Sequence, residues 1–409
     1  MGVALRISTM KLRSKEPYGL LKNGLINTYP SLQRNASCDV LIVGGGITGS
    51  LLAYQFSKEG YKTILIDKRD VSFGSTSAST SLLQYEIDEP LYSLMEKVGE
   101  HAAVDTYLEG VKAIEKLGKV VLALKTECSF QHKRSVYLAN SKKDAEWMAT
   151  EFDCRKRIGL KVKWLTKAQL KRQFGANGEG AILSEAGAST DVYRLVHCLL
   201  EYASKYQGLT IYDHTALLKV HHDRNRCIVE VEGNHQITTK KIIYATGYES
   251  QEILKDKVVD LISTYAFVSE PIRVPHHLKY NIFWDSEDPY LYMRTTDDNR
   301  ILVGGEDEQF KNPERRDRLI DKKQEKLLEK ITKKFEGLKL IPDYAWAGTF
   351  GVTKDALPYI GEHPDYPNSY FALAFGGNGI TFSVMGMQIL SDAMAGKHNK
   401  FLEHFRFKR

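Results

Sequence analysis

Residues 40–67 read VLIVGGGITGSLLAYQFSKEGYKTILID, and this stretch decides the fold that we expect. Residues 40–43 form a short apolar run rich in β-branched side chains, which is typical of a buried parallel strand. Gly44, Gly46 and Gly49 follow in the spacing G-x-G-x-x-G. On its own this spacing is a weak signal, so its value depends on the elements around it.

Those elements are present on both sides of the glycines. A helical pattern of apolar residues follows them and ends at Gly60, and a second apolar strand at residues 63–66 leads into Asp67. A strand, a glycine turn, a helix, a strand and an acid thus succeed one another within about thirty residues, as the dinucleotide-binding βαβ unit requires. We therefore predict a dinucleotide cradle rather than a merely structural turn.

Each position of this unit has a physical role. Gly44 permits the tight turn, Gly46 lets the backbone approach a pyrophosphate, and Gly49 lets the helix pack closely against the strand. The N-terminus of the helix offers N–H groups and the positive end of its dipole to the phosphates. Asp67 lies where an acid can accept hydrogen bonds from ribose hydroxyls.

Composition limits the other possibilities. The chain has 409 residues, 43% of them hydrophobic, and a net charge of +6, and we find no basic stripe interleaved with aromatics. This predicts two or three globular domains and no nucleic-acid partner. The five scattered cysteines form no C-x-x-C pair, so we predict no metal site. Without a signal-like segment or a run of about 18 apolar residues, we expect a cytoplasmic protein with no transmembrane segment.

The choice between NAD and FAD depends on three later stretches. Seven Ser and Thr residues lie between positions 72 and 81, which suits wrapping of a phosphate and a flavin chain, although a polar surface linker is the alternative. Residues 240–247 form a strand that ends in Ala-Thr-Gly. Residues 368–390 form a strand, a second glycine turn and a helix, which can hold a polar cofactor edge.

These segments together resemble the D-amino-acid oxidase family of flavoproteins, which contains glycine oxidase, sarcosine oxidase and γ-glutamylputrescine oxidase. The segments that carry the resemblance, in the order of the family, are CDVLIVGGGITGS (38–50), GSTSAST (74–80), IIYATG (242–247), YMRTTDDNRILVGG (292–305), GVTKDALPYIG (351–361) and FGGNGI (375–380). The resemblance implies that FAD, rather than NAD, is the cofactor.

The resemblance also implies roles for individual residues. Carried over by position, the residues expected around the cofactor are Gly44, Gly46, Ile47, Thr48 and Gly49 at the pyrophosphate, Asp67 at the ribose, Lys68 near the adenosine, Ser75, Thr76, Ser77 and Ser79 on the path to the flavin, Thr246 and Gly247 beneath the pyrophosphate, and Gly377, Asn378, Gly379 and Ile380 beside the ring. We expect non-covalent FAD, because the chain has no cysteine after Cys227 and no histidine in the Ser/Thr loop.

The chain departs from the family where a substrate carboxylate is usually held by arginine or lysine. Phe350 stands where glycine-oxidase-like members have arginine, and residues 82–86 and 377–381 contain no cation. A small free amino acid is therefore a less suitable substrate than the family suggests. The candidate substrate residues are Gln84, Tyr85, Glu86, Tyr292, Arg294 and Phe350. Glu86 could attract a cationic amine. For both Glu86 and Arg294, a structural role is the alternative.

The expected fold class is mixed α/β, with a Rossmann-like FAD/NAD(P)-binding domain and a discontinuous substrate domain built on an antiparallel sheet. The predicted division is a lead-in at 1–37, FAD-binding parts at 38–118, 185–255 and 343–409, and substrate-domain parts at 119–184 and 256–342.

The predicted activity is oxidation of a C–N bond in an amine or N-substituted amino acid by hydride transfer to the flavin. A small amine-type molecule is the expected partner, and O2 or another electron acceptor remains open, as does the choice between oxidase and dehydrogenase. Two alternatives stay: an FAD-dependent dehydrogenase of a 2-hydroxy acid or glycerol-phosphate-like alcohol, and a non-catalytic flavoprotein subunit.

Overall fold

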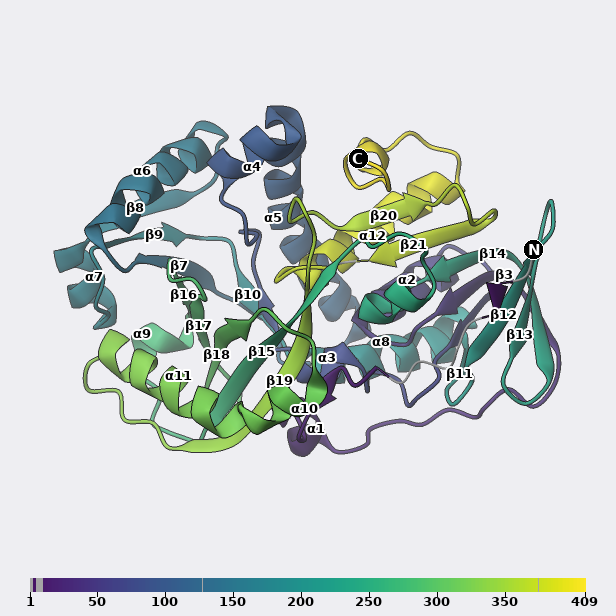
Figure 1. Ribbon diagram of the computed structural model, residues 1–409, viewed down its shortest axis with the longest axis horizontal. Coiled ribbons are helices and arrows are strands. Elements are labelled where there is room, and N and C mark those ends of the chain that lie inside the picture. Colours follow the sequence, from purple (N-terminus) through teal and green to yellow (C-terminus); the bar gives the residue numbers. More distant parts are fainter. Residues whose placement is uncertain (1–2, 5–9, 127, 374) are drawn as a thin grey trace.

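The computed structural model describes residues 3–4, 10–126, 128–373 and 375–409. Two large mixed sheets dominate it and lie on opposite sides in Figure 1, and the second sheet includes the long strands β15 (Asp260–Ser269) and β19 (Pro342–Val352) near the middle of the view. Neither sheet closes into a barrel. Among the described residues, no helix is both long and apolar enough to cross a lipid bilayer.

The first sheet contains the predicted dinucleotide unit. Its parallel strands are β3 (Ala36–Val43), β4 (Thr63–Ile66), β11 (Thr210–Tyr212), β14 (His235–Tyr244) and β21 (Ser369–Leu373). Its antiparallel strands are β1 (Val3–Ala4), β12 (Leu217–His222), β13 (Cys227–Val231) and β20 (Tyr359–Glu362). The apolar run at residues 40–43 is fully or almost fully buried in β3, as expected for a parallel strand covered on both faces.

Helices pack against one another over this sheet. The principal ones are α2 (Ile47–Lys58), α5 (Glu100–Leu124), α8 (Val192–Gln207) and α12 (Gly379–Met394), and α2 contacts both α8 and α12. Most residues of α2 are buried, so its stability comes from tertiary packing rather than from one amphipathic face. Three short helices follow β4, β14 and α12 in the chain: α3 (Ser75–Ala78), the 3-10 helix η1 (Gly247–Glu252) and α13 (Phe401–His404).

The second sheet contains β15 and β19 and is antiparallel except at one pair, where β16 (Asn281–Asp285) runs parallel to β7 (Arg134–Ala139). Its other strands are β2 (Arg13–Ser14), β8 (Val162–Thr166), β9 (Gly180–Ser184), β17 (Leu291–Thr295) and β18 (Ile301–Glu308). The helices on this side are α6 (Lys142–Arg157), α7 (Lys167–Phe174), α9 (His276–Lys279), α10 (Pro313–Arg318) and α11 (Ile320–Lys334), and α4 (Leu91–Val98) packs against α5 and α6. A small third sheet joins β5 (Leu82–Leu83), β10 (Ala188–Ser189) and β6 (Gln131–His132).

The strands alternate between the two large sheets along the chain, which is the arrangement of a discontinuous domain. One strand departs from the expected division: β19 lies in the segment assigned to the FAD-binding part, yet it pairs with β15 over most of its length. The chain therefore leaves the second sheet only after Val352. The exact domain boundaries stay a prediction.

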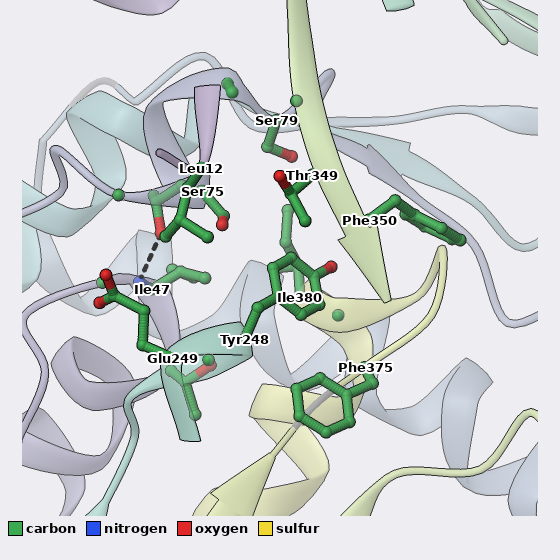
Figure 2. A pocket seen from close by; sticks show the side chains of 18 of the residues that line it. Leu12, Ile47, Ser75, Ser79, Tyr248, Glu249, Thr349, Phe350, Phe375 and Ile380 are labelled. Carbon is green, nitrogen blue, oxygen red and sulfur yellow. Dashed lines mark hydrogen bonds between the residues drawn. The ribbon is translucent and has the colours of Figure 1, made fainter. Parts of the chain in front are cut away.

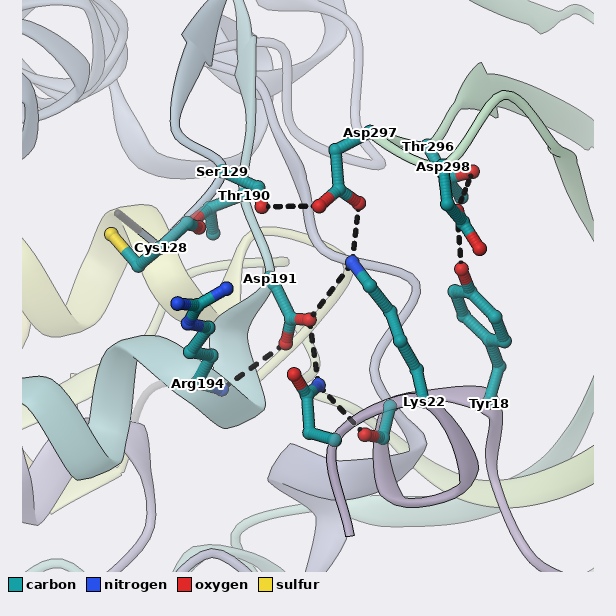
Figure 3. Close-up of polar contacts among 12 residues, drawn as sticks. Tyr18, Lys22, Cys128, Ser129, Thr190, Asp191, Arg194, Thr296, Asp297 and Asp298 are labelled. Atoms are coloured by element: carbon teal, nitrogen blue, oxygen red, sulfur yellow. Dashed lines mark hydrogen bonds and ion pairs between the residues drawn. The ribbon is translucent and has the colours of Figure 1, made fainter. Parts of the chain in front are cut away.

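The N-terminal lead-in is more ordered than expected. It contains β2 and a short helix, α1 (Tyr18–Asn23), and Figure 3 shows Lys22 of α1 lying between Asp191 and Asp297. Lys22 pairs with Asp191, the N-cap of α8, and with Asp297 in the β17–β18 turn. This segment thus ties the α8 side of the first sheet to the second sheet.

Candidate active site

The turn between β3 and α2 can be made only by glycine at two of its positions. Gly44 has φ +112°, and a Cβ atom there would overlap the carbonyl oxygen of Ala245. A Cβ on Gly49 would overlap the carbonyl oxygen of Gly44. These two glycines therefore bring α2 and the end of β14 against the turn, as predicted for close helix–strand packing.

Gly46, the N-cap of α2, faces a large cavity instead. A Cβ there would lie 3.0 Å from Oγ1 of Thr76, and this hydroxyl accepts the N–H of Ile47 at 3.0 Å (Figure 2). The first turn of α2 has further N–H groups without acceptors inside the helix, because the first four residues of any helix lack them. This bare helix N-terminus at a cavity can bind an anion.

The acid at the end of β4 lies beside this turn. Asp67 accepts the N–H groups of Gly45 at 2.7 Å and Arg69 at 2.9 Å and also lines the cavity. Burial raises its pKa, although Arg69 and the two N–H groups partly oppose the shift. A carboxylate has about four acceptor positions, so Asp67 can organise the loop and still accept from a ribose.

Lys68 and Arg69 line the same end of the cavity and both pair with Glu249 of η1. The Nζ atom of Lys68 lies 2.9 Å from Oε1 of Glu249, and Nη2 of Arg69 lies 2.9 Å from Oε2. Figure 2 shows Glu249 near Ile47, on the opposite side of the cavity from Phe350 and Phe375. Among the described residues, Lys68 and Arg69 are the only lysine, arginine or histidine side chains that line the cavity.

Most residues expected at the cofactor line this one cavity. They are Gly44, Gly46, Ile47, Thr48, Asp67, Lys68, Ser75, Thr76, Ser79, Thr246, Gly247, Gly377, Asn378, Gly379 and Ile380. Two do not: Gly49 packs beneath the turn, and Ser77 donates to the carbonyl of Gly74 and borders a second, smaller cavity. Among the expected substrate residues, Gln84, Glu86, Tyr292 and Phe350 line the large cavity.

Arg294 lies on the same strand as Tyr292 but has another environment. It lines the small cavity, where its Nε donates to the carbonyl of Thr80 at 2.5 Å and its Nη1 to that of Thr295 at 3.1 Å. Burial lowers its pKa. The guanidinium thus holds the backbone of the Ser/Thr loop, and this geometry favours the structural alternative over substrate contact.

Tyr85 and Glu86 point into a buried charged cluster behind the cavity. Arg155 on α6 lies between Glu86, at 3.4 Å, and Glu151, at 2.6 Å, and its guanidinium also lies over the ring of Tyr85 at 5.6 Å. Burial raises the pKa of Glu86, and Arg155 opposes that shift. The carboxylate expected to attract an amine is therefore already paired with a cation.

The C-terminal glycine turn is fastened to the segment after the Ser/Thr loop. The side-chain amide of Asn378 donates to the carbonyls of Gln84 at 2.9 Å and Glu86 at 2.7 Å, and the hydroxyl of Thr381 donates to Gln84 as well. The N–H of Gly377 donates to Oδ2 of Asp88 at 2.9 Å. The C-terminal glycine turn and the segment that follows the Ser/Thr loop thus form one hydrogen-bonded unit.

Four residues that line the end of the cavity remote from Asp67 were not predicted from the sequence as site residues. Asp88, Trp284, Tyr290 and Asp307 line the cavity there together with Tyr292. Burial raises the pKa of Asp307 to about 6, and the nearby Asp88 adds to the rise. Tyr290 lies two residues before the candidate Tyr292, and because residues two apart on a strand share a face, the sequence did contain a signal for it. No local signal identified the two acids.

Gly304 makes room for one of these aromatic rings. A Cβ on Gly304 would overlap the ring of Tyr292, its cross-strand partner on β17. We expect Gly304→Ala to displace Tyr292 and to weaken substrate binding about tenfold, since overpacking costs on the order of 1–3 kcal/mol. Flavin content, read from visible absorbance, should stay that of the parent. An unchanged KM would contradict a role for this ring in binding.

The cavity fits a flavin dinucleotide in three respects. It runs from the N-terminus of α2 and Asp67 to the second glycine turn, a Cβ on Gly46 would crowd Oγ1 of Thr76 at 3.0 Å, and Oγ1 of Thr246 is buried there without a hydrogen-bond partner among the described residues. Gly46, Thr246 and the first turn of α2 would hold the pyrophosphate, and Asp67 the ribose. The fold and this site define a dinucleotide-dependent oxidoreductase.

Comparison with known proteins narrows this class. The family profile DAO, FAD dependent oxidoreductase, matches residues 39–393. Glycine oxidase of Geobacillus kaustophilus is 22% identical over 380 residues, which cover 89% of this chain and 94% of that protein. Gamma-glutamylputrescine oxidoreductase of Escherichia coli is 23% identical over 395 residues, which cover 93% and 90%.

A solved structure agrees at the level of the fold. The crystal structure of glycine oxidase from Geobacillus kaustophilus superimposes with a TM-score of 0.76 and 19% identity, over 92% of this chain and 99% of the other. The chain belongs to the DAO family of FAD-dependent oxidoreductases. The predicted family, mixed α/β fold, enzyme class and FAD cofactor are thereby confirmed.

Proposed function

We propose that this enzyme removes a hydride from a carbon next to an amine nitrogen, giving an imine that water hydrolyses. The observation that carries the proposal is the end of the large cavity remote from Asp67, where aromatic and acidic side chains lie and no described lysine, arginine or histidine does. An amine suits such a surface, whereas a substrate recognised by its carboxylate or phosphate requires a cation.

FAD, when bound, supplies the acceptor for the hydride. The chain's own residues position the reactants. Asn378 and Thr381 fix the second glycine turn against Gln84, and Arg294 fixes the Ser/Thr loop through Thr80. The aromatic side chains at this end of the cavity, Trp284 and Tyr292 among them, limit the water around a bound amine.

The rival activity, oxidation of a 2-hydroxy acid or a glycerol-phosphate-like alcohol, fits the site less well. Such substrates carry an anionic group, and the cations available in the cavity, Lys68 and Arg69, lie beside Asp67 and are paired with Glu249. A non-catalytic flavoprotein subunit would have no need of the acidic and aromatic side chains, Asp88 and Tyr290 among them, that line the same cavity as the cofactor residues.

We also propose that the FAD is held without a covalent bond. Within the part of the chain that the structure describes, no cysteine or histidine lines the large cavity. Cysteine and histidine are the side chains that could tether the flavin covalently. Precipitation with acid should therefore release all of the yellow chromophore into the supernatant.

The test is an anaerobic titration of the purified holoenzyme, followed by the visible absorbance of the oxidised flavin. Amines and N-alkyl amino acids should bleach the band, and admission of air should show by peroxide formation whether O2 is the electron acceptor. Bleaching by 2-hydroxy acids or glycerol phosphate alone would replace this proposal with the alcohol activity. Bleaching by neither class, with capture of a protein partner, would favour the non-catalytic subunit.

A further inference from the structure

The cavity end remote from Asp67 has a composition that goes beyond binding of a single amine. We propose that Asp88, Trp284, Tyr290, Tyr292 and Asp307, here called the cationic subsite, bind a second positively charged group of the substrate, so that the enzyme acts on diamines or polyamines without a carboxylate. This inference rests on the proposed amine oxidation and names the class of amine.

The charges in the subsite are of one sign. Asp88 and Asp307 both line the cavity, and the only described basic residues on its wall, Lys68 and Arg69, are at the other end. The Oδ1 atom of Asp307 is buried and has no hydrogen-bond partner among the described residues. A buried carboxylate oxygen without a partner is costly, and a cationic group in the cavity would satisfy it.

A β-bulge directs Asp307 into this cavity. Gly305 and Glu306 have φ of +134° and +57°, and the pairing of β18 with β15 shifts by one residue between Gly305 and Glu308. As a result Glu306 turns toward α11, where it pairs with Lys323 at 3.1 Å and Lys330 at 2.6 Å, and Asp307 lines the cavity. Bulges often redirect side chains next to active sites.

Asp88 reaches the subsite because position 377 has no side chain. A Cβ on Gly377 would lie 2.7 Å from Oδ1 of Asp88. Oδ2 accepts the N–H of Gly377 at 2.9 Å, and the hydroxyl of Tyr290 lies 3.4 Å from Oδ1. The carboxylate is thus held at the glycine turn on one side and by the aromatic residues on the other.

The aromatic rings complete the subsite. The rings of Tyr290 and Tyr292 lie 5.8 Å apart with an interplanar angle of 43°. Trp284 is stacked on Tyr137 at 3.5 Å, and its Nε1 donates to Ser135 at 3.1 Å, so its ring has a fixed orientation. Ammonium groups bind over such ring faces within about 6 Å of the centroid, most strongly when water is excluded.

The test compares amines of equal length that differ only in the remote group. α,ω-Diamines of three to six methylene groups, the matching monoamines and the matching ω-amino acids are mixed anaerobically with the holoenzyme, and flavin reduction gives a rate and a half-saturating concentration. We expect half-saturation at the lowest concentration for diamines, then monoamines, then ω-amino acids. An order that places the ω-amino acids first would overturn the proposal.

Asp307→Asn keeps the shape of the side chain and removes its charge. We expect the half-saturating concentration of the diamines to rise about tenfold or more, because the neutral amide cannot replace the charge-assisted hydrogen bond that the carboxylate accepts from an ammonium group, and that of the monoamines to change little. Glu308→Gln, which removes the neighbouring carboxylate that pairs with Lys323 and lies outside the cavity, is the matched control. Equal effects of the two substitutions on diamines would refute the subsite.

A non-oxidisable probe separates this inference from the proposed function. Tetramethylammonium carries a positive charge but no N–H donor, so it should perturb the flavin spectrum of the parent enzyme at lower concentrations than those needed with Asp307→Asn, through attraction to the carboxylate alone. If no amine bleaches the flavin but tetramethylammonium binding depends on Asp307, the proposed reaction fails and the cationic subsite stands. If amines bleach the flavin and binding is insensitive to Asp307, the subsite fails and the reaction stands.

Discussion

Gly46→Val is expected to give a folded protein that retains little or no FAD. Gly46 is the N-cap of α2 and faces the large cavity, and a Cβ there would already lie 3.0 Å from Oγ1 of Thr76. A valine would place two further methyl groups between the pyrophosphate and the N–H groups of the first turn. Loss of even about 2.8 kcal/mol would weaken binding about 100-fold.

The ratio of flavin to protein absorbance measures the retained cofactor, and circular dichroism shows whether the variant is folded. Gly386→Ala is the matched control, since a Cβ at this position in α12 would meet Cδ1 of Ile360 at 3.6 Å, an ordinary contact. A Gly46→Val enzyme that purifies fully yellow would rule out the assignment of this turn to the pyrophosphate.

Arg155→Met is expected to lower the free energy of unfolding by about 3–5 kcal/mol, the cost of breaking a buried ion pair from one side. Arg155 is fully buried and pairs with both Glu86 and Glu151. Removing it leaves two carboxylates in an apolar environment, and burial already raises the pKa of Glu86. Denaturant titration monitored by tryptophan fluorescence measures the change.

Two comparisons make this result specific. Arg157→Met on the same helix removes an exposed pair with Glu100 and should cost less than about 1 kcal/mol. Adding Glu151→Gln to Arg155→Met should restore part of the stability, because it removes one of the two unpaired charges. If the two arginine substitutions cost the same, the buried cluster does not stabilise the fold as inferred.

The sequence predicted the cofactor half of the site well for a local reason. The strand, the glycine turn, the helix and the acid of residues 40–67 are contiguous, and the glycine spacing that shapes the turn is itself local, as the overlap between a Cβ on Gly49 and the carbonyl of Gly44 illustrates. Gly46, Ile47 and Thr76 consequently lie together at the cavity as expected. Short-range patterns of this kind are visible without any tertiary information.

The substrate half of the site could not be predicted in the same way. Tyr292 and Arg294 lie two residues apart on β17, a spacing that puts side chains on one face of a strand, but only packing decided that Tyr292 borders the large cavity and Arg294 the small one. Glu86 follows the predicted loop, yet Arg155, which is 69 residues away along the chain, already occupies its carboxylate. Distant partners decide what a side chain can still bind.

The sequence by itself determined that this chain builds a flavin dinucleotide cradle and that the usual carboxylate-binding cations are missing, because both properties depend on residue identity within short segments. Only the tertiary structure decided what stands in the place of those cations. A one-residue bulge on β18 exchanges the directions of Glu306 and Asp307, and a glycine turn 289 residues away in sequence gives Asp88 its place. Backbone pairing between distant strands and loops sets these directions, and no local pattern encodes them.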